Sequence, residues 1–312
     1  MGASYRIKHY YHSGFSIHSE DTLLIFDYWR GDNGELPPES QITEPFLRRF
    51  RRVIVFISHE PPDHMDPIVF SWREIKDLDI TYLVSSDMPV GTRGKRMAPR
   101  DTLTLADDLT VTAYDSTDLG VSFLVDFRGT RFFHAGDLNF WHWRDESTMQ
   151  EIDEAEQEFQ AAVRPLCDQA IDVAFFPVDP RLGTMFEAGA NYFILSVKPR
   201  LLIPMHYFRR SDIAVDYARN ASGRTTEVLA MPDIGEEIQL DVDESGYLNI
   251  SFPPPGEEGS LSTQDNPFLE SDLPLEDLDS DLPPINFDEE PPPLPPEGDS
   301  PQEPESFPPP QT

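Results

Sequence analysis

The stretch Ser58-His59-Glu60-Pro61-Pro62-Asp63-His64-Met65-Asp66 decides how the rest of the chain is interpreted. It follows Val53–Ser58, a short hydrophobic run that predicts a buried strand. Asp66 then stands as an N-cap before Pro67 and predicts a helix over Ile68–Lys76. Two imidazoles and a carboxylate at a strand end suit zinc or a similar divalent ion. Taken alone, the stretch is equally compatible with a polar loop.

Two further segments repeat this pattern at the ends of hydrophobic runs. One is Phe133-His134-Ala135-Gly136-Asp137, in which Gly136 lets the backbone bend so that Asp137 turns into a site. The other is Ile203-Pro204-Met205-His206. A buried, hydrogen-bonded histidine is the ordinary interpretation of each histidine by itself. The three segments together predict a metal site.

The body of the chain alternates predicted strands and helices. Arg128-Gly129 predicts a hairpin turn, and an apolar stripe from Met149 to Leu166 predicts a helix that ends or kinks near Pro165. This order of elements predicts stacked sheets covered by helices. The predicted strands are Val53–Ser58, Ile80–Ser85, Leu109–Tyr114, Val121–Phe127, Thr130–Ala135, Val173–Val178 and Arg200–Met205.

Composition divides the 312 residues into a body, 1–252, and a tail, 253–312. The tail holds 16 acidic residues, 17 prolines and no lysine or arginine, so removing it changes the formal net charge from −33 to −17. Its few apolar residues cannot offset the entropy of ordering, which predicts a disordered, acidic, proline-rich tail. The run Pro291–Pro296 is either solubilising or a ligand for a partner that recognises polyproline.

Charge and cysteine content exclude several classes of protein. A chain this acidic repels phosphate backbones and anionic lipid, so we expect neither a nucleic-acid partner nor a membrane partner. The single cysteine, Cys167, allows no intramolecular disulfide. The N-terminus lacks the apolar core of a signal peptide, and nowhere do about 18 apolar residues run together. These features predict a cytoplasmic protein.

The same segments resemble the metallo-β-lactamase-fold hydrolases, with the greatest similarity to the subgroup around the L-ascorbate-6-phosphate lactonases. The resemblance covers about residues 5–210 and implies an αββα four-layer sandwich with a metal site at one edge between the sheets. It also implies metal-assisted hydrolysis, often with two zinc or manganese ions. The matching segments are YHSGFSI, LLIFDY, VFISHEPPDHMD, STDLGVSFLV, FFHAGDLNFWHW, DVAFFPVDPRLG and LLIPMHYF.

The resemblance implies one complete metal site and one incomplete site. The complete site has Asp63, His64, Asp137 and His206. The other keeps only His59 and a share of Asp137, because Pro61 stands where the family has a second histidine and the stretch 115–118 contains no histidine. We therefore expect one Zn²⁺ (or Mn²⁺) ion per chain.

Other residues are assigned supporting roles. Asp63 is expected to orient or deprotonate the catalytic water while touching the metal. His12 either acts on substrate or is a hydrogen-bonded structural histidine. His134 is expected behind the ligands rather than among them, because strand alternation puts it out of phase with Asp137. Asp118, like His134, is a possible replacement ligand if two ions are bound.

Aromatic and basic residues suggest how substrate is held. Trp141, His142 and Trp143 either wall a pocket or pack in the core. Arg181 and Arg209 either hold a substrate carboxylate or phosphate or form ion pairs with the acidic body. The basic run is either an anion contact or a solvated loop, and consists of Arg93, Lys95, Arg96 and Arg100.

The leading hypothesis is a metal-dependent hydrolase that uses a metal-bound water on a small-molecule lactone, ester or phosphodiester. The alternative is a non-catalytic binding protein of the same fold with a degraded metal site, of which Pro61 is the trace. A third hypothesis is a scaffold whose tail recruits a partner.

Overall fold

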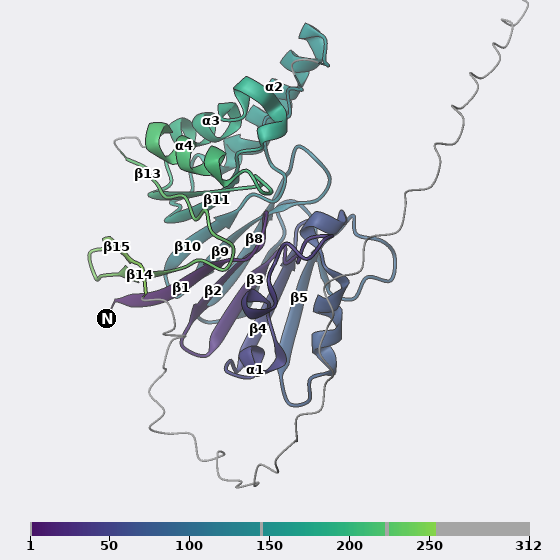
Figure 1. The fold of residues 1–312 in the computed structure, drawn as a ribbon, viewed down its shortest axis with the longest axis vertical. Coiled ribbons are helices and arrows are strands. Elements are labelled where there is room, and N and C mark those ends of the chain that lie inside the picture. The colour runs from purple at the N-terminus through teal and green to yellow at the C-terminus, as the bar shows by residue number, and fades with distance from the viewer. Residues whose placement is uncertain (1, 144–145, 222–224, 254–312) are drawn as a thin grey trace, which may run out of the picture. The chain divides into compact units, whose positions relative to one another are not determined.

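The computed structural model describes residues 2–143, 146–221 and 225–253, and within these residues the strands form two sheets (Figure 1). The first sheet has eight strands, which are in spatial order β15 (Leu248–Ser251), β14 (Glu237–Val242), β1 (Ala3–His9), β2 (Phe15–Ser19), β3 (Thr22–Phe26), β4 (Arg52–Ile57), β5 (Asp79–Ser85) and β6 (Lys95–Met97). The second has seven strands, which are β13 (Glu227–Val228), β12 (Leu201–Met205), β11 (Val173–Pro177), β10 (Thr130–His134), β9 (Ser122–Phe127), β8 (Leu109–Tyr114) and β7 (Thr102–Ala106).

The two sheets pack face to face through large aromatic side chains. Phe56 of β4 meets Phe123 of β9 edge to face at 5.3 Å, and Phe15 of β2 lies 4.5 Å from Phe175 of β11. Tyr5 of β1 donates its hydroxyl to the carbonyl oxygen of Phe127 at 2.8 Å. These side chains are fully buried, so the main hydrophobic core lies between the sheets.

Helices cover the outer faces of both sheets, which gives the four layers predicted from the sequence. The helices α2 (Met149–Val163), α3 (Ala188–Ser196) and α4 (Ser211–Ala221) lie beside the second sheet (Figure 1). On the first sheet, the short helix α1 (Glu44–Leu47) and the 3₁₀ segment η3 (Pro67–Glu74) cover a separate cluster that includes Val53, Val55 and Trp72. The αββα architecture is therefore confirmed.

The predicted strands and the hairpin are confirmed, and each strand differs from its predicted range by a residue or two at most. Arg128 and Gly129 have φ of +54° and +82° and join β9 to β10, with Phe127 paired to Thr130. The helix with the apolar stripe is α2, which is followed by a 3₁₀ turn, η4 (Arg164–Leu166), around Pro165.

One predicted helix ends earlier than expected and has the 3₁₀ form. Asp66 caps the segment as predicted, accepting a hydrogen bond from the Ile68 amide at 2.9 Å, but η3 is a 3₁₀ helix that ends at Glu74. The segment consists largely of β-branched and aromatic residues, which are poorer formers of α-helix than Ala, Leu or Glu.

The predicted tail, 253–312, lies outside the described residues apart from Pro253. Within the described part of the chain, no helix is long and apolar enough to cross a membrane.

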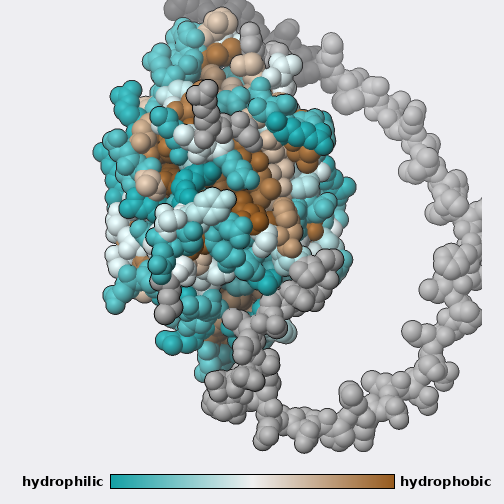
Figure 2. All heavy atoms as spheres, turned by 90° about the vertical axis from the view of Figure 1, so that its left-hand side faces the viewer, coloured by the Kyte–Doolittle hydropathy of each residue, from teal (hydrophilic) through white to brown (hydrophobic). Residues whose placement is uncertain are grey.

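On the face shown in Figure 2, hydrophilic residues surround the hydrophobic ones.

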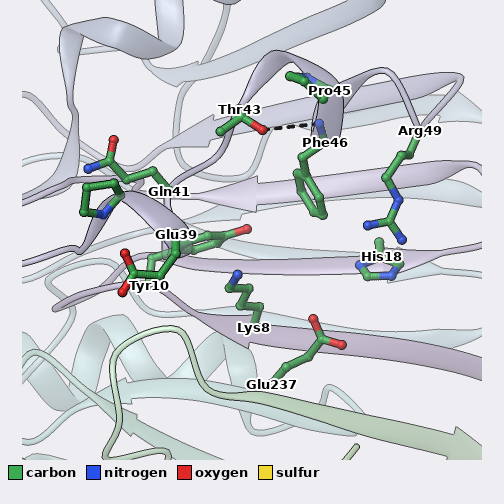
Figure 3. Close-up of a pocket in the computed structure, with 11 residues that line it drawn as sticks. Lys8, Tyr10, His18, Glu39, Gln41, Thr43, Pro45, Phe46, Arg49 and Glu237 are labelled. Carbon is green, nitrogen blue, oxygen red and sulfur yellow. Dashed lines mark hydrogen bonds between the residues drawn. The ribbon is translucent and has the colours of Figure 1, made fainter. Parts of the chain in front are cut away.

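A pocket of about 270 Å³ lies on the outer face of the first sheet (Figure 3), and none of the predicted metal ligands lines it. Lys8, His18 and Arg49 line it, together with the Phe46 ring that His18 meets edge to face at 6.4 Å. Burial, and then the positive charges of Arg49, Arg6 and Lys8, lower the pKa of His18 to about 4.

His18 should make the protein less stable in mild acid. Its pKa is about 4 in the folded chain and about 6.5 when unfolded, so the unfolded state binds more protons between these values and stability falls as pH drops from about 6.5 towards 4. When the pH is lowered from 7 to 4.5, the unfolding free energy of the wild type should fall by about 2 kcal/mol more than that of the His18→Gln variant, as measured by urea denaturation. Parallel pH curves for the two proteins would contradict the prediction.

Candidate metal centre

The candidate ligands are brought together by the carboxyl ends of parallel strands. β3 and β4 run parallel in the first sheet, and β10, β11 and β12 run parallel in the second. Polar side chains that follow these strands therefore collect at one edge of the sandwich. His59 and the 3₁₀ turn η2 (Pro62–His64) follow β4, Asp137 follows β10, and His206 follows β12.

Three imidazole nitrogens face the Asp137 carboxylate. The Nε2 atoms of His64 and His206 lie 3.0 and 3.1 Å from Oδ1, and His59 Nε2 lies 3.2 Å from Oδ2. The Nε2 atoms of His64 and His206 are 3.4 Å apart. All three imidazoles are buried, and Asp137 is 7 % exposed.

Buried oxygen atoms behind these imidazoles fix which ring nitrogen points inward. His64 Nδ1 donates to Asp27 at 2.9 Å, and His206 Nδ1 donates to Asp179 at 2.8 Å. Ser58 donates its hydroxyl to Asp27 at 2.6 Å, so its Oγ accepts from His59 Nδ1 at 2.9 Å. When one of these rings is neutral, its proton stays on Nδ1, and Nε2 then turns a lone pair towards Asp137.

This donor set fits a metal ion. Lone pairs facing a carboxylate repel it unless a cation lies between them, and Asp137 Oδ1 has no well-directed hydrogen bond within the described residues. Atoms bound to one tetrahedral zinc at about 2.0–2.1 Å lie about 3.3 Å apart, close to the separations found here. Imidazole nitrogen and carboxylate oxygen are ligands that zinc and manganese accept.

Asp63 and His12 extend the cluster towards solvent. Asp63 Oδ2 lies 3.6 Å from His12 Nε2, and the His12 ring is 3.9 Å from that of His206. Each of His12, Asp63, His64 and His206 offers one ligand atom within 4.8 Å of the others. Neither His12 nitrogen has a well-formed hydrogen bond in the described part of the chain. That His12 might itself be a ligand was not foreseen from the sequence.

The two predicted substitute ligands lie outside both candidate clusters. His134 donates from Nε2 to the Ser13 carbonyl at 2.9 Å and accepts at Nδ1 from the Gly136 amide at 3.2 Å. With both nitrogens engaged, it lies behind the site, 3.8 Å from Asp27. Asp118 is at the rim, where its carboxylate accepts from the Leu119 amide.

The site is strongly polarised. Burial alone would raise the pKa of Asp137, but the charges of His64 and His206 hold it well below its usual value. Burial alone would lower the pKa of His64, but Asp137 and Asp27 raise it well above 6.5. Burial and the nearby His206 lower the pKa of His12 to about 3. His12 is therefore neutral at pH 7, and an ion that binds His64 must displace a proton.

The backbone around the site adopts unusual conformations. His12, Asp27 and His206 have φ of +57°, +41° and +68°, in the left-handed region that side chains other than glycine rarely occupy. Gly136, with φ of +54°, packs against Ser58, and an added Cβ would lie 2.8 Å from the Ser58 Cβ. Such strain persists where surrounding contacts hold it, and it gathers at functional sites.

A pocket of about 370 Å³ opens onto the cluster. Trp141 donates its indole N–H to the Asp137 carbonyl at 2.8 Å and stacks on Trp143 at 5.7 Å, so both indoles wall the pocket. His142 instead faces the Met185 carbonyl at 3.3 Å. The complete lining is Pro61, Asp63, Thr117, Asp118, Asp137, Trp141, Trp143 and Arg181.

The basic residues singled out in the sequence have different surroundings. Arg181 pairs with Asp179 and lines the pocket, whereas Arg209 pairs with Glu35 at 2.9 Å and does not line it. Arg96 donates to the carbonyls of residues 86, 88 and 89, so it holds a loop together. Its neighbours Arg93, Lys95 and Arg100 are exposed and outside this pocket.

Sequence reasoning missed the two buried carboxylates behind the ligands. Asp27 follows the hydrophobic strand β3, and Asp179 comes two residues after β11. Both show the strand-end pattern that identified Asp137, so the signal was present. Their function as partners of His64 and His206 depends on packing between segments 37 and 27 residues apart.

Comparison with known proteins supports the fold. No protein-family model and no curated protein sequence matches the chain. Among solved structures, a metallo hydrolase from the hyperthermophilic archaeon Ignicoccus hospitalis matches with a TM-score of 0.55 at 17 % identity, covering 76 % of this chain and 98 % of the other. A metallo-β-lactamase fold protein from Bacillus subtilis matches with a TM-score of 0.50 at 14 % identity, covering 76 % and 99 %. The chain therefore has the metallo-β-lactamase fold, as the sequence resemblance implied.

Proposed function

We propose that the protein is a metal-dependent hydrolase of a small-molecule ester, lactone or phosphodiester. One observation carries the proposal: His59, His64 and His206 turn their Nε2 atoms towards a single buried carboxylate, beside an open pocket. His64, His206 and Asp137, which lie within 3.4 Å of one another, would hold one Zn²⁺ or Mn²⁺ ion. Asp63 or His12, which cluster with the same two histidines, would complete the set. When bound, the ion supplies Lewis acidity, which acidifies a water ligand and polarises the oxygen of the bond to be broken.

The chain's own residues would position and deprotonate the attacking water. Asp63 lines the pocket, and although burial opposes it, the neighbouring His12 and His64 keep the Asp63 pKa below its usual value. Its ionised carboxylate orients the water and accepts its proton. Neutral His12, whose Nε2 is 3.6 Å from Asp63, would contact the substrate or its leaving group. Trp141 and Trp143 exclude bulk water from one side.

The choice of substrate bond rests on the sequence resemblance. A lactone is the bond implied by the lactonase subgroup, whereas an ester or a phosphodiester agrees equally with the pocket. The acidic body favours a small-molecule substrate over a nucleic acid. The single Cys167 favours a cytoplasmic location.

Metal analysis combined with a hydrolase panel tests the proposal. Protein grown with zinc or manganese should contain one equivalent of ion and hydrolyse at least one member of a panel of lactones, esters and phosphodiesters. A chelator should abolish turnover and lower the melting temperature of the wild type, but not that of a double variant, Asp63→Ala/His206→Ala. Bound metal with no turnover on any substrate class would contradict catalysis.

A non-catalytic binding protein is the second candidate, and Pro61 favours it. Pro61 lines the pocket beside Asp63, where the family resemblance places an imidazole ligand. Protein without metal after growth in supplemented medium would support this alternative.

The wild type should bind one ion firmly, and Pro61→His should raise the occupancy of a second site. The other candidate cluster consists of His59, His64 and Asp137, so it shares His64 with the cluster of His12, Asp63, His64 and His206. It also shares Asp137 with the ligand set proposed above. One imidazole of its own is too few to hold a second ion. We expect the variant to bind between one and two equivalents, measured by elemental analysis, with Pro62→His as a neighbouring control. Two fully occupied sites in the wild type would contradict the prediction.

A further inference from the structure

Arg181 is placed by contacts on three sides. It follows Asp179 at the start of the 3₁₀ segment η5 (Pro180–Met185), and its Nε lies 2.9 and 3.0 Å from the two Asp179 carboxylate oxygens. Its guanidinium lies over the rings of Trp143 at 5.7 Å and Phe208 at 5.2 Å. Asp179 also accepts from His206, so the same carboxylate orients a candidate metal ligand and this cation.

Part of the guanidinium remains available to a ligand. Asp179 engages Nε and Nη2, and no described residue forms a hydrogen bond or ion pair with Nη1. The side chain is 49 % exposed although its position is fixed. A planar fork with free donors is suited to a carboxylate or phosphate.

Arg181 is surrounded by negative charge in the lining of the pocket. Among the described residues that line it, Arg181 is the single positive side chain, and Asp63, Asp118 and Asp137 are negative. Without a bound ion, the pocket would repel an anion. In the proposed function, the divalent ion offsets Asp63 and Asp137, which leaves Arg181 as the attractive charge beside a wall of two stacked indoles.

We propose that Arg181 binds the anionic group of the substrate, a carboxylate or a phosphate, while Trp141 and Trp143 contact its apolar body. The preferred substrates are then small hydrolysable anions with a flat or apolar portion, rather than neutral esters. This inference rests on the proposed hydrolase function.

A matched series of esters tests the inference. We would compare kcat/KM for 4-nitrophenyl hydrogen succinate, its neutral methyl ester and 4-nitrophenyl 3-phosphonopropionate. The wild type should prefer one or both anions, and the better anion identifies the carboxylate or the phosphate source. Arg181→Gln should lower the ratio of anionic to neutral kcat/KM by about 10- to 100-fold, and Arg181→Lys should lower it less. Using a ratio removes any general effect transmitted through Asp179 and His206.

Arg210→Gln is the matched control, because Arg210 also pairs with an aspartate two positions away, Asp212, but does not line the pocket. It should leave the ratio unchanged. An equal fall for anionic and neutral esters in Arg181→Gln, with turnover of both in the wild type, would overturn the inference and leave the hydrolase proposal standing.

A binding measurement separates the two proposals. Tryptophan fluorescence should report benzoate and phenylphosphonate binding to the metal-loaded wild type, with benzyl alcohol as the neutral comparison. Arg181→Gln should weaken anion binding about 10-fold or more without affecting benzyl alcohol. Arg181-dependent anion binding without turnover of any lactone, ester or phosphodiester would support the anion site and overturn the hydrolase. Neither binding nor turnover in the wild type would overturn both.

Discussion

Replacing His206 by alanine should remove the metal and reduce kcat/KM for any hydrolysed substrate by about 10³-fold or more. His206 gives its Nε2 to the centre of the cluster, 3.1 Å from Asp137 and 3.4 Å from His64 Nε2. Without it, the ion keeps at most His12, His64, Asp63 and Asp137 as ligands. Asp137 and Asp179 each lose a buried partner. Elemental analysis of the purified variant should find well below one equivalent of ion.

The control for this variant is another histidine of the same chain. His18 lies in the pocket on the outer face of the first sheet, and His18→Gln should keep both metal and turnover. Circular dichroism would establish that His206→Ala is folded. One full equivalent of ion in folded His206→Ala would show that the ligands are elsewhere.

Replacing Asp27 by alanine should lower the unfolding free energy by about 3–5 kcal/mol. This carboxylate is 1 % exposed and accepts from the Ser58 amide and hydroxyl and from His64 Nδ1, so its loss leaves three buried donors unpaired. It should also weaken metal binding about 10- to 100-fold, because the His64 ring is no longer held in place. Urea denaturation and a competitive chelator titration measure the two effects.

Asp27→Asn separates charge from shape, because an amide oxygen can still accept from His64. We expect it to retain more stability than alanine and to weaken metal binding all the same. Asp212→Ala is the comparison at the surface, where the carboxylate is exposed and pairs with Arg210, and it should leave the unfolding midpoint unchanged. Equal stability of the Asp27 and Asp212 alanine variants would contradict the importance assigned to Asp27.

The ends of the hydrophobic strands were the features that could best be predicted from the sequence. Runs such as Leu109–Tyr114 are nearly continuous in hydrophobic or β-branched residues, so the points at which they stop are well marked and the polar residues that follow stand out. The strand-end pattern singled out Asp137 and His206, and the family resemblance grouped them with the stretch after β4. In the structure, the parallel strands β10, β11 and β12 end at the same edge of their sheet.

The contacts between different helices, strands and loops were harder to predict from the sequence. The placing of His12 over the His206 ring depends on two residues in different segments having left-handed backbones, for which neither position carries a glycine signal. The strands β1–β3, β6, β7 and β13–β15 were not in the predicted list. Of these, β6 and β7 are short, partly exposed and rich in charged or threonine side chains, which weakens the hydrophobic signal.

The candidate cluster draws its members from both sheets, since His59 and His64 follow a strand of the first and Asp137 and His206 follow strands of the second. An ion held there would tie together residues 142 positions apart, His64 and His206. The chain has one cysteine and cannot form an internal disulfide, so the ion would be the cross-link that a disulfide provides in other proteins. By loop-closure entropy, a cross-link of this span restricts the unfolded chain by up to about 5 kcal/mol. Cellular metal supply would then set the protein's lifetime as well as its activity.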